Sequence, residues 1–160
     1  MEKPFFVSHT AGLVFDEPKD WYQYVQQQYQ YVQQHGYTAK EVVLESNGFK
    51  WNIHNCCLNP KRTEIIKNMT ATPYEEFTIS TAQRADNLWV YGYHHNGILS
   101  DIWAGGGCSA GYDGDTFSTE DDAIKGALKK MLENKDLTPK FRSIIQTEYN
   151  KRRIVQLTLF

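Results

Sequence analysis

The chain has 160 residues, 41% of them hydrophobic and 22% charged, with a formal net charge of −2 at pH 7. These values indicate one ordinary globular domain and argue against two full domains or a wholly disordered chain. The apolar stretches are short and interrupted, so no membrane span is expected, and the nearly balanced charge gives no overall field that indicates a polyanionic partner.

The first forty residues predict a short β-hairpin followed by a helix. Residues 5–7 and 13–15 are the candidate strands. Acids and a proline in residues 16–20 favour a helix start, and Gly36 stands where a left-handed C-cap is needed. Six residues recur at helical spacing, and their aromatic face is expected in the core: Trp21, Tyr24, Val25, Gln28, Tyr31 and Val32.

The next thirty residues predict a second hairpin and a short helix. Within residues 41–57, an apolar run at 42–44 precedes Ser46-Asn47-Gly48 and alternating apolar residues at 49, 51 and 53 follow it; Asn-Gly is the strongest turn signal of the chain. Asn59-Pro60 then favours the start of a helix over residues 61–69. The apolar side of this expected helix is formed by Ile65, Ile66 and Met69.

An antiparallel meander of three strands is expected over residues 76–82, 88–94 and 98–104. Residues 85–87 and Asn96-Gly97 provide the turn signals between them. The middle strand places three aromatic residues on one face: Trp89, Tyr91 and Tyr93.

The last third predicts a glycine-rich loop over residues 105–114 and two helices. Ser118 or Thr119 caps the first helix, which has acids at its start and two lysines near its end. Its apolar stripe consists of Ala123, Ile124, Ala127, Leu128, Met131 and Leu132, and we expect it to pack on the sheet. The second helix begins at Thr138-Pro139 and runs into residues 151–153, whereas periodicity does not assign residues 154–160.

These elements predict an α+β domain over residues 1–155. A hairpin and a three-strand meander form the antiparallel sheet, helices pack against it, and the second half has a β-β-β-α core. No internal repeat and no Pro-, Gly- or Ser-rich linker divides the chain. Residues 156–160 are interpreted as a separate C-terminal tail.

The cysteines and histidines do not predict a metal centre. Cys56 and Cys57 are adjacent and Cys108 is distant, so the odd set forms no disulfide framework and suits a reducing compartment. His94 and His95 are also adjacent, and neither Cys-x-x-Cys nor His-x-x-x-His occurs. With no secretion signal at the N-terminus, we expect a cytoplasmic protein that holds neither metal nor cofactor.

A catalytic role is the weaker interpretation of the glycine-rich segment. Cys108 lies among glycines whose backbone N–H groups could stabilise an oxyanion, and His94 or His95 could act as the base. No cysteine-protease motif accompanies these residues, and a flexible loop also explains the glycines. Acids gather near this loop at 113, 115 and 120–122, but the spacing of an EF-hand is absent, and helix capping and dipole compensation account for residues 120–122. We therefore expect an interaction protein rather than an enzyme.

The last five residues carry the most specific signal. Gln156-Leu157-Thr158-Leu159-Phe160 resembles the pentapeptide by which many bacterial replication, repair and mobile-element proteins dock on the ring-shaped DNA sliding clamp. The common form of that peptide is Gln-Leu-Ser/Asp-Leu-Phe, so four of five positions match and Thr158 is a conservative departure. The resemblance implies an accessory or regulatory protein of a bacterium, phage or mobile element that binds the clamp in extended form.

Two alternatives remain open for this end of the chain. Val155, Leu157 and Leu159 alternate with polar residues, as a terminal edge strand would. The other alternative is a nucleic-acid-binding module. It would stack bases on the meander aromatics Trp89, Tyr91 and Tyr93 and contact phosphates, directly or on DNA inside the clamp, through Lys151, Arg152 and Arg153.

Overall fold

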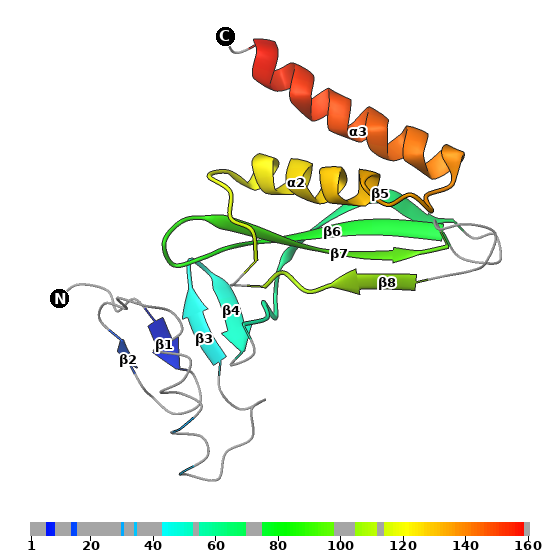
Figure 1. Ribbon diagram of the computed structural model, residues 1–160. Coiled ribbons are helices and arrows are strands. Elements are labelled where there is room, and N and C mark those ends of the chain that lie inside the picture. Colours follow the sequence, from blue (N-terminus) through cyan, green and yellow to red (C-terminus); the bar gives the residue numbers. More distant parts are fainter. Residues whose placement is uncertain are drawn as a thin grey trace.

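The computed structural model describes two antiparallel sheets and the two helices that follow them (Figure 1). The described residues are 6–8, 14–15, 30, 34, 43–52, 55–69, 75–97, 105–111 and 114–158. This architecture confirms the α+β class and the β-β-β-α second half. It places the expected hairpin and the expected meander in different sheets.

The first sheet consists of short strands in the order β2-β1-β3-β4. Its strands are β1 (Phe6–Ser8), β2 (Val14–Phe15), β3 (Val43–Ser46) and β4 (Phe49–Asn52). Both hairpins predicted from the sequence are present. Asn47 and Gly48 turn the chain between β3 and β4 with φ angles of 55° and 80°. This left-handed pair matches the twist of a two-residue hairpin loop, which is why Asn-Gly is favoured there. The helix expected up to Gly36 lies outside the described residues, apart from Gln30 and Gln34, which are helical.

The second sheet has the strand order β5-β6-β7-β8, so consecutive strands are neighbours. Its strands are β5 (Lys61–Met69), β6 (Glu75–Gln83), β7 (Trp89–Asn96) and β8 (Gly105–Cys108). Strands β6 and β7 confirm the first two strands of the meander, whereas the third expected strand, residues 98–104, lies outside the described residues. The loop prediction is wrong for β8, because these residues pair with Tyr93–Asn96 of β7.

The short helix predicted for residues 61–69 is also wrong, because this segment is the edge strand β5. Its pairing with β6 shifts register between Glu64 and Ile66 and again between Ile66 and Met69. Each such bulge adds a residue and breaks the alternation of a regular strand. A strand with these bulges need not alternate apolar and polar residues, which explains why the helix-like spacing of Ile65, Ile66 and Met69 occurs in a strand.

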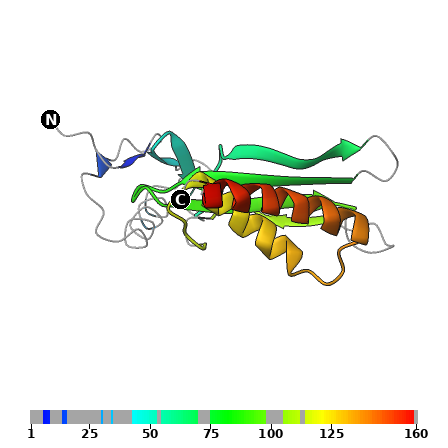
Figure 2. The same ribbon diagram turned by 90° about the horizontal axis from the view of Figure 1, so that it is seen from above.

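Two helices cover one face of the second sheet (Figures 1 and 2). Helix α2 (Glu120–Leu132) contacts β6 and β7, and helix α3 (Pro139–Thr158) contacts α2 and β5. Within the described residues, no helix has an apolar stretch long enough to cross a membrane. The buried residues of α2 confirm the stripe expected from the sequence: Ala123, Ile124, Ala127, Leu128 and Met131.

The described hydrophobic core has two parts. The larger part lies between the second sheet and its helices, where Phe77 and Ile79 of β6 are fully buried against the helical layer. In the smaller part, Phe49 and Trp51 of β4 pack against Ala82 and Val90 of the second sheet. Asn47 reinforces this second contact by donating its side-chain N–H to the backbone oxygen of Arg84 at 2.6 Å. The β3–β4 hairpin is thus held against the end of the β6–β7 hairpin.

The N-cap of α2 offers a test of how this helix is stabilised. The hydroxyl of Thr119 accepts a hydrogen bond from the backbone N–H of Asp122 at 3.1 Å, whereas Ser118 is exposed and lies one residue earlier. We expect Thr119→Ala to lower the free energy of unfolding by about 1 kcal/mol, because it leaves a helix-terminal N–H without its acceptor. Ser118→Ala is the matched control and should change it by less than about 0.5 kcal/mol. Equal losses in urea denaturation of the two variants would contradict this assignment.

Candidate functional site

Helix α3 carries the candidate partner-binding residues and is anchored at its N-terminal half. Phe141 and Ile145 are 2% and 0% exposed in the core beneath it. The guanidinium of Arg142 donates to the backbone oxygens of Leu132 and Asn134, at 2.9 and 2.6 Å. These bonds satisfy carbonyls at the end of α2 that have no partner inside the helix. The connection between the two helices is therefore fixed by packing and by hydrogen bonds.

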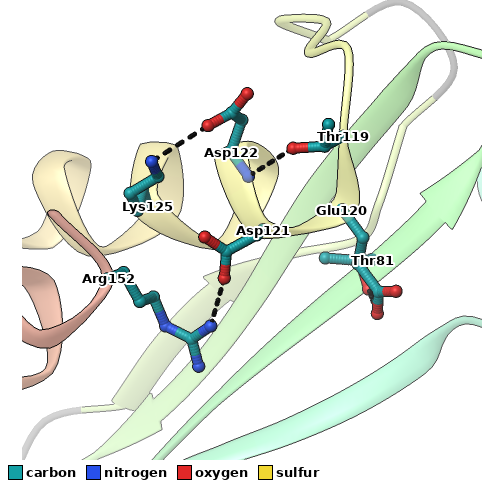
Figure 3. A network of polar contacts seen from close by, with 7 residues as sticks. All are labelled: Thr81, Thr119, Glu120, Asp121, Asp122, Lys125 and Arg152. Atoms are coloured by element: carbon teal, nitrogen blue, oxygen red, sulfur yellow. Dashed lines mark hydrogen bonds and ion pairs between the residues drawn. The ribbon is translucent and has the colours of Figure 1, made fainter. Parts of the chain in front are cut away.

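The C-terminal half of α3 returns to the N-terminus of α2, where a group of polar contacts holds it (Figure 3). Arg152 donates to a carboxylate oxygen of Asp121 at 2.5 Å. Around it, the Asp122 carboxylate lies 3.0 Å from the Lys125 ammonium, and Glu120 accepts a hydrogen bond from the Thr81 hydroxyl at 3.2 Å. All three acids of the first turn of α2 thus have protein partners, which supports their assignment to the helix start and not to a cation site.

The basic residues of this segment are partly paired within the protein. Lys151 lies 3.2 Å from Glu148, one helical turn earlier, and Arg152 is bound to Asp121. The side chain of Arg153 lies outside the described residues. Two of the three cations proposed for phosphate contacts would therefore have to leave a carboxylate before they bind a phosphate. This pairing weakens the interpretation of residues 151–153 as a nucleic-acid surface.

The structure places the first part of the tail in helix α3. Gln156, Leu157 and Thr158 continue the helical backbone, so the alternative of a terminal edge strand is wrong for them. Leu159 and Phe160 lie outside the described residues, as do the side chains of residues 156–158. The pentapeptide therefore begins on the last turn of a helix, and not on a segment that is already extended.

Of the aromatic residues of β7, Tyr91 and Tyr93 pack against the core beneath the helices, and Trp89 packs against the smaller part of the core. The Tyr91 ring is 5.9 Å from Phe117, and Tyr93 is 6.0 Å from His95 in a stacked arrangement. Burial raises the pKa of the Tyr91 hydroxyl above its usual range. Trp89 at the end of the strand is 5.9 Å from Phe49, with the Lys61 ammonium 5.5 Å above its ring. These rings have protein partners and do not form an open platform for stacked bases.

The cysteines and histidines occupy three different environments. Cys57 is buried, which raises the pKa of its thiol, whereas Cys108 is exposed on β8. His95 is 6% exposed, and burial, followed by the influence of the neighbouring His94, lowers the pKa of its ring. Within the described ranges, no three histidine, cysteine or acidic side chains come together as metal ligands. Gly105–Cys108 form a paired strand, so the expected glycine-rich loop, which both the catalytic interpretation and its alternative assumed, is not present at these residues.

The strand pairing also brings together residues that the sequence did not connect. Arg62 of β5 lies opposite Ser80 of β6, and Ser80 lies opposite Gly92 of β7. The helix expected over residues 61–69 concealed this grouping. The β-branched residues Thr63, Ile65 and Ile66 were the available signal for a strand.

Comparison of the chain with protein-family models, with curated proteins and with solved structures gave no match.

The buried imidazole of His95 predicts a pH dependence of stability. Its pKa in the folded protein lies below the ordinary value of 6.5, so below that pH the unfolded chain binds more protons than the folded one. The contribution of the neutral His95 ring to the free energy of unfolding should be complete above pH 6.5. The free energy of unfolding should fall as the pH drops below that value. Thermal unfolding between pH 7.5 and about 5 should show a shallower decline for His95→Gln than for the wild type. An identical decline in the two proteins would contradict the assignment.

Proposed function

We propose that this protein docks on the DNA sliding clamp through residues 156–160. It would act there as a non-enzymatic accessory or regulatory protein of a bacterium, phage or mobile element. The observation that carries the proposal is the match of Gln156-Leu157-Thr158-Leu159-Phe160 to the clamp-binding pentapeptide. The folded domain would be brought to sites of replication or repair, or would compete there with other clamp-binding proteins.

The residue types of the tail suit an extended peptide in an apolar groove. The amide of Gln156 has two donors and an acceptor, which would fix the register of the peptide. Leu157 would act as an anchor, and Leu159 and Phe160 would fill the main pocket. Burial of these three side chains at about 1.5 to 3 kcal/mol each gives roughly 5 to 9 kcal/mol before the ordering costs are subtracted. A micromolar, transient interaction is therefore expected.

Docking in extended form requires the last turn of α3, which contains Gln156 to Thr158, to unwind. Helix propagation contributes at most a few tenths of a kcal/mol per residue, so opening a single terminal turn by its backbone hydrogen bonds costs about 1 kcal/mol. This cost is small beside the apolar burial that docking would provide. The ion pair between Arg152 and Asp121 would hold the rest of the helix on the domain, so that only the residues after it change conformation.

The proposal is tested by the binding of the intact chain to a purified bacterial sliding clamp in surface plasmon resonance. Phe160→Ala should weaken binding at least tenfold, because loss of about 1.5 to 3 kcal/mol of apolar burial corresponds to that factor or more. Gln156→Ala should weaken it through loss of register. Thr158→Ser is the matched control, because it converts the tail to the common form of the peptide and should retain the affinity.

Unchanged affinity in both alanine variants would refute docking through the tail. Ionic strength separates the proposal from direct binding to nucleic acid. A peptide held by apolar contacts should respond weakly to salt, whereas binding to DNA phosphates should weaken steeply between about 50 and 200 mM salt. Salt-sensitive binding to DNA together with no binding to the clamp would favour the nucleic-acid-binding module instead.

A further inference from the structure

A cleft of about 370 Å³ lies at the second sheet, beside the segment that leads into β5. Its polar lining includes Arg62, Ser80, His94 and Ser109, and its apolar lining includes Leu58, Pro60 and Ala110. Among the described residues, both helices lie on the face that buries Phe77 and Ile79. Strand alternation places Ser80 on the opposite face. The cleft is therefore separate from α3.

The register of the sheet creates the floor of this cleft. Arg62, Ser80 and Gly92 lie opposite one another on three adjacent strands. Gly92 has no side chain, and a Cβ there would lie 2.4 Å from the backbone nitrogen of Ala110 and 2.5 Å from the backbone oxygen of Cys108. The chain after β8 therefore passes directly over Gly92 and forms one wall.

The opposite wall is fixed by hydrogen bonds to the β3–β4 hairpin. The side-chain oxygen of Asn59 accepts from the backbone N–H of Lys50 at 2.7 Å, and its amide donates to the backbone oxygen of Gly48 at 3.1 Å. The backbone N–H of Leu58 donates to the oxygen of Lys50 at 2.8 Å. The backbone N–H of Cys57 donates to Ala110 at 3.0 Å and so joins the two walls. The cleft is preformed, which lowers the entropic cost of binding a ligand.

One end of the cleft suits an anion. Arg62 is exposed and has no carboxylate partner among the residues that the structure describes. Its guanidinium could donate two parallel hydrogen bonds to a carboxylate or phosphate, and the Ser80 hydroxyl lies on the adjacent strand. His94 also lines the cleft, and its Nε2 lies 3.0 Å from the Asn96 amide nitrogen and 3.3 Å from a Glu76 carboxylate oxygen.

The other end of the cleft is apolar. Leu58 is 52% exposed, and it is the one large hydrophobic side chain that stands so far into solvent in the described part of the chain. Pro60 and the buried Ala110 lie beside the same cleft. A volume of this size exceeds what an inorganic oxyanion fills and lies at the lower end of the range for small-molecule sites.

We propose that this cleft binds a small organic anion, with its carboxylate or phosphate group at Arg62 and Ser80 and its apolar body against Leu58 and Pro60. Arg62 supplies the charge, Ser80 a neutral hydrogen bond, and Leu58 the apolar contact that distinguishes an organic anion from an inorganic one. The site does not depend on docking to the sliding clamp, and removal of residues 156–160 should leave it intact.

The proposal is tested by NMR titration of the isotopically labelled full chain with phenyl phosphate, benzoate, inorganic phosphate and benzyl alcohol. Phenyl phosphate or benzoate should bind at least tenfold more tightly than the inorganic ion or the uncharged alcohol, and should shift the amide signals of residues 107–110. The organic anion that binds more tightly identifies the acidic group. Arg62→Gln should weaken its binding at least tenfold, because the charge-assisted hydrogen bonds are lost.

Lys67→Gln is the matched control, because Lys67 is an exposed cation on the same strand that does not line the cleft. It should leave the affinity unchanged. Leu58→Ser should weaken the binding of phenyl phosphate and leave the binding of inorganic phosphate unaffected. The proposal fails if neither organic anion saturates a signal by about 10 mM, or if Arg62→Gln and Lys67→Gln weaken binding equally. It also fails if the shifted signals lie outside the cleft.

Discussion

The pairing of β6 with β7 is the interaction on which the rest of the molecule depends. It is continuous from Glu76 opposite Asn96 to Gln83 opposite Trp89, whereas the pairing of β5 is interrupted by bulges. One face of this hairpin buries Phe77 and Ile79 beneath α2 and α3. The turn end of the hairpin supports β4 through a second, smaller cluster. Both parts of the core, the anchoring of α3 and the floor of the cleft are therefore set by one antiparallel pair of strands.

Local signals in the sequence predicted the elements that short-range physics determines. The Asn47-Gly48 turn, the cap and apolar stripe of α2 and the start of α3 all lie where the residue types indicate. The errors at Lys61–Met69 and Gly105–Cys108 have a different origin. The bulges of the first segment interrupt its strand alternation, so its apolar spacing looks helical. The second segment has three glycines and one side chain, too few to show a period, and its strand conformation comes from pairing with β7. The conformation of both segments is determined by pairing with strands elsewhere in the fold, and a short stretch of sequence does not show that pairing.

The two sites differ in what a sequence can reveal about them. The tail is a continuous peptide, so its candidate role can be read from five consecutive residues. The helical conformation of Gln156 to Thr158 could not be predicted from those residues. The internal pairing of Arg152 with Asp121 spans 31 positions and needed the packing of α3 against α2. The cleft, by contrast, cannot be recognised in the sequence. Arg62, Ser80 and Gly92 are neighbours only through strand register, and their spacing in the chain carries no motif.

The cluster that joins the two sheets has a consequence for the order in which the protein can acquire its structure on the ribosome. Trp51 is synthesised about 60 residues before Ala110, and both belong to this cluster. At about 5 to 20 residues per second, the β3–β4 hairpin therefore waits roughly 3 to 12 s for the surface that buries its aromatic residues. Its Asn-Gly turn can close in microseconds, but Phe49 and Trp51 remain exposed until the second sheet emerges. During this interval the aromatic residues of β4 are open to capture by a chaperone.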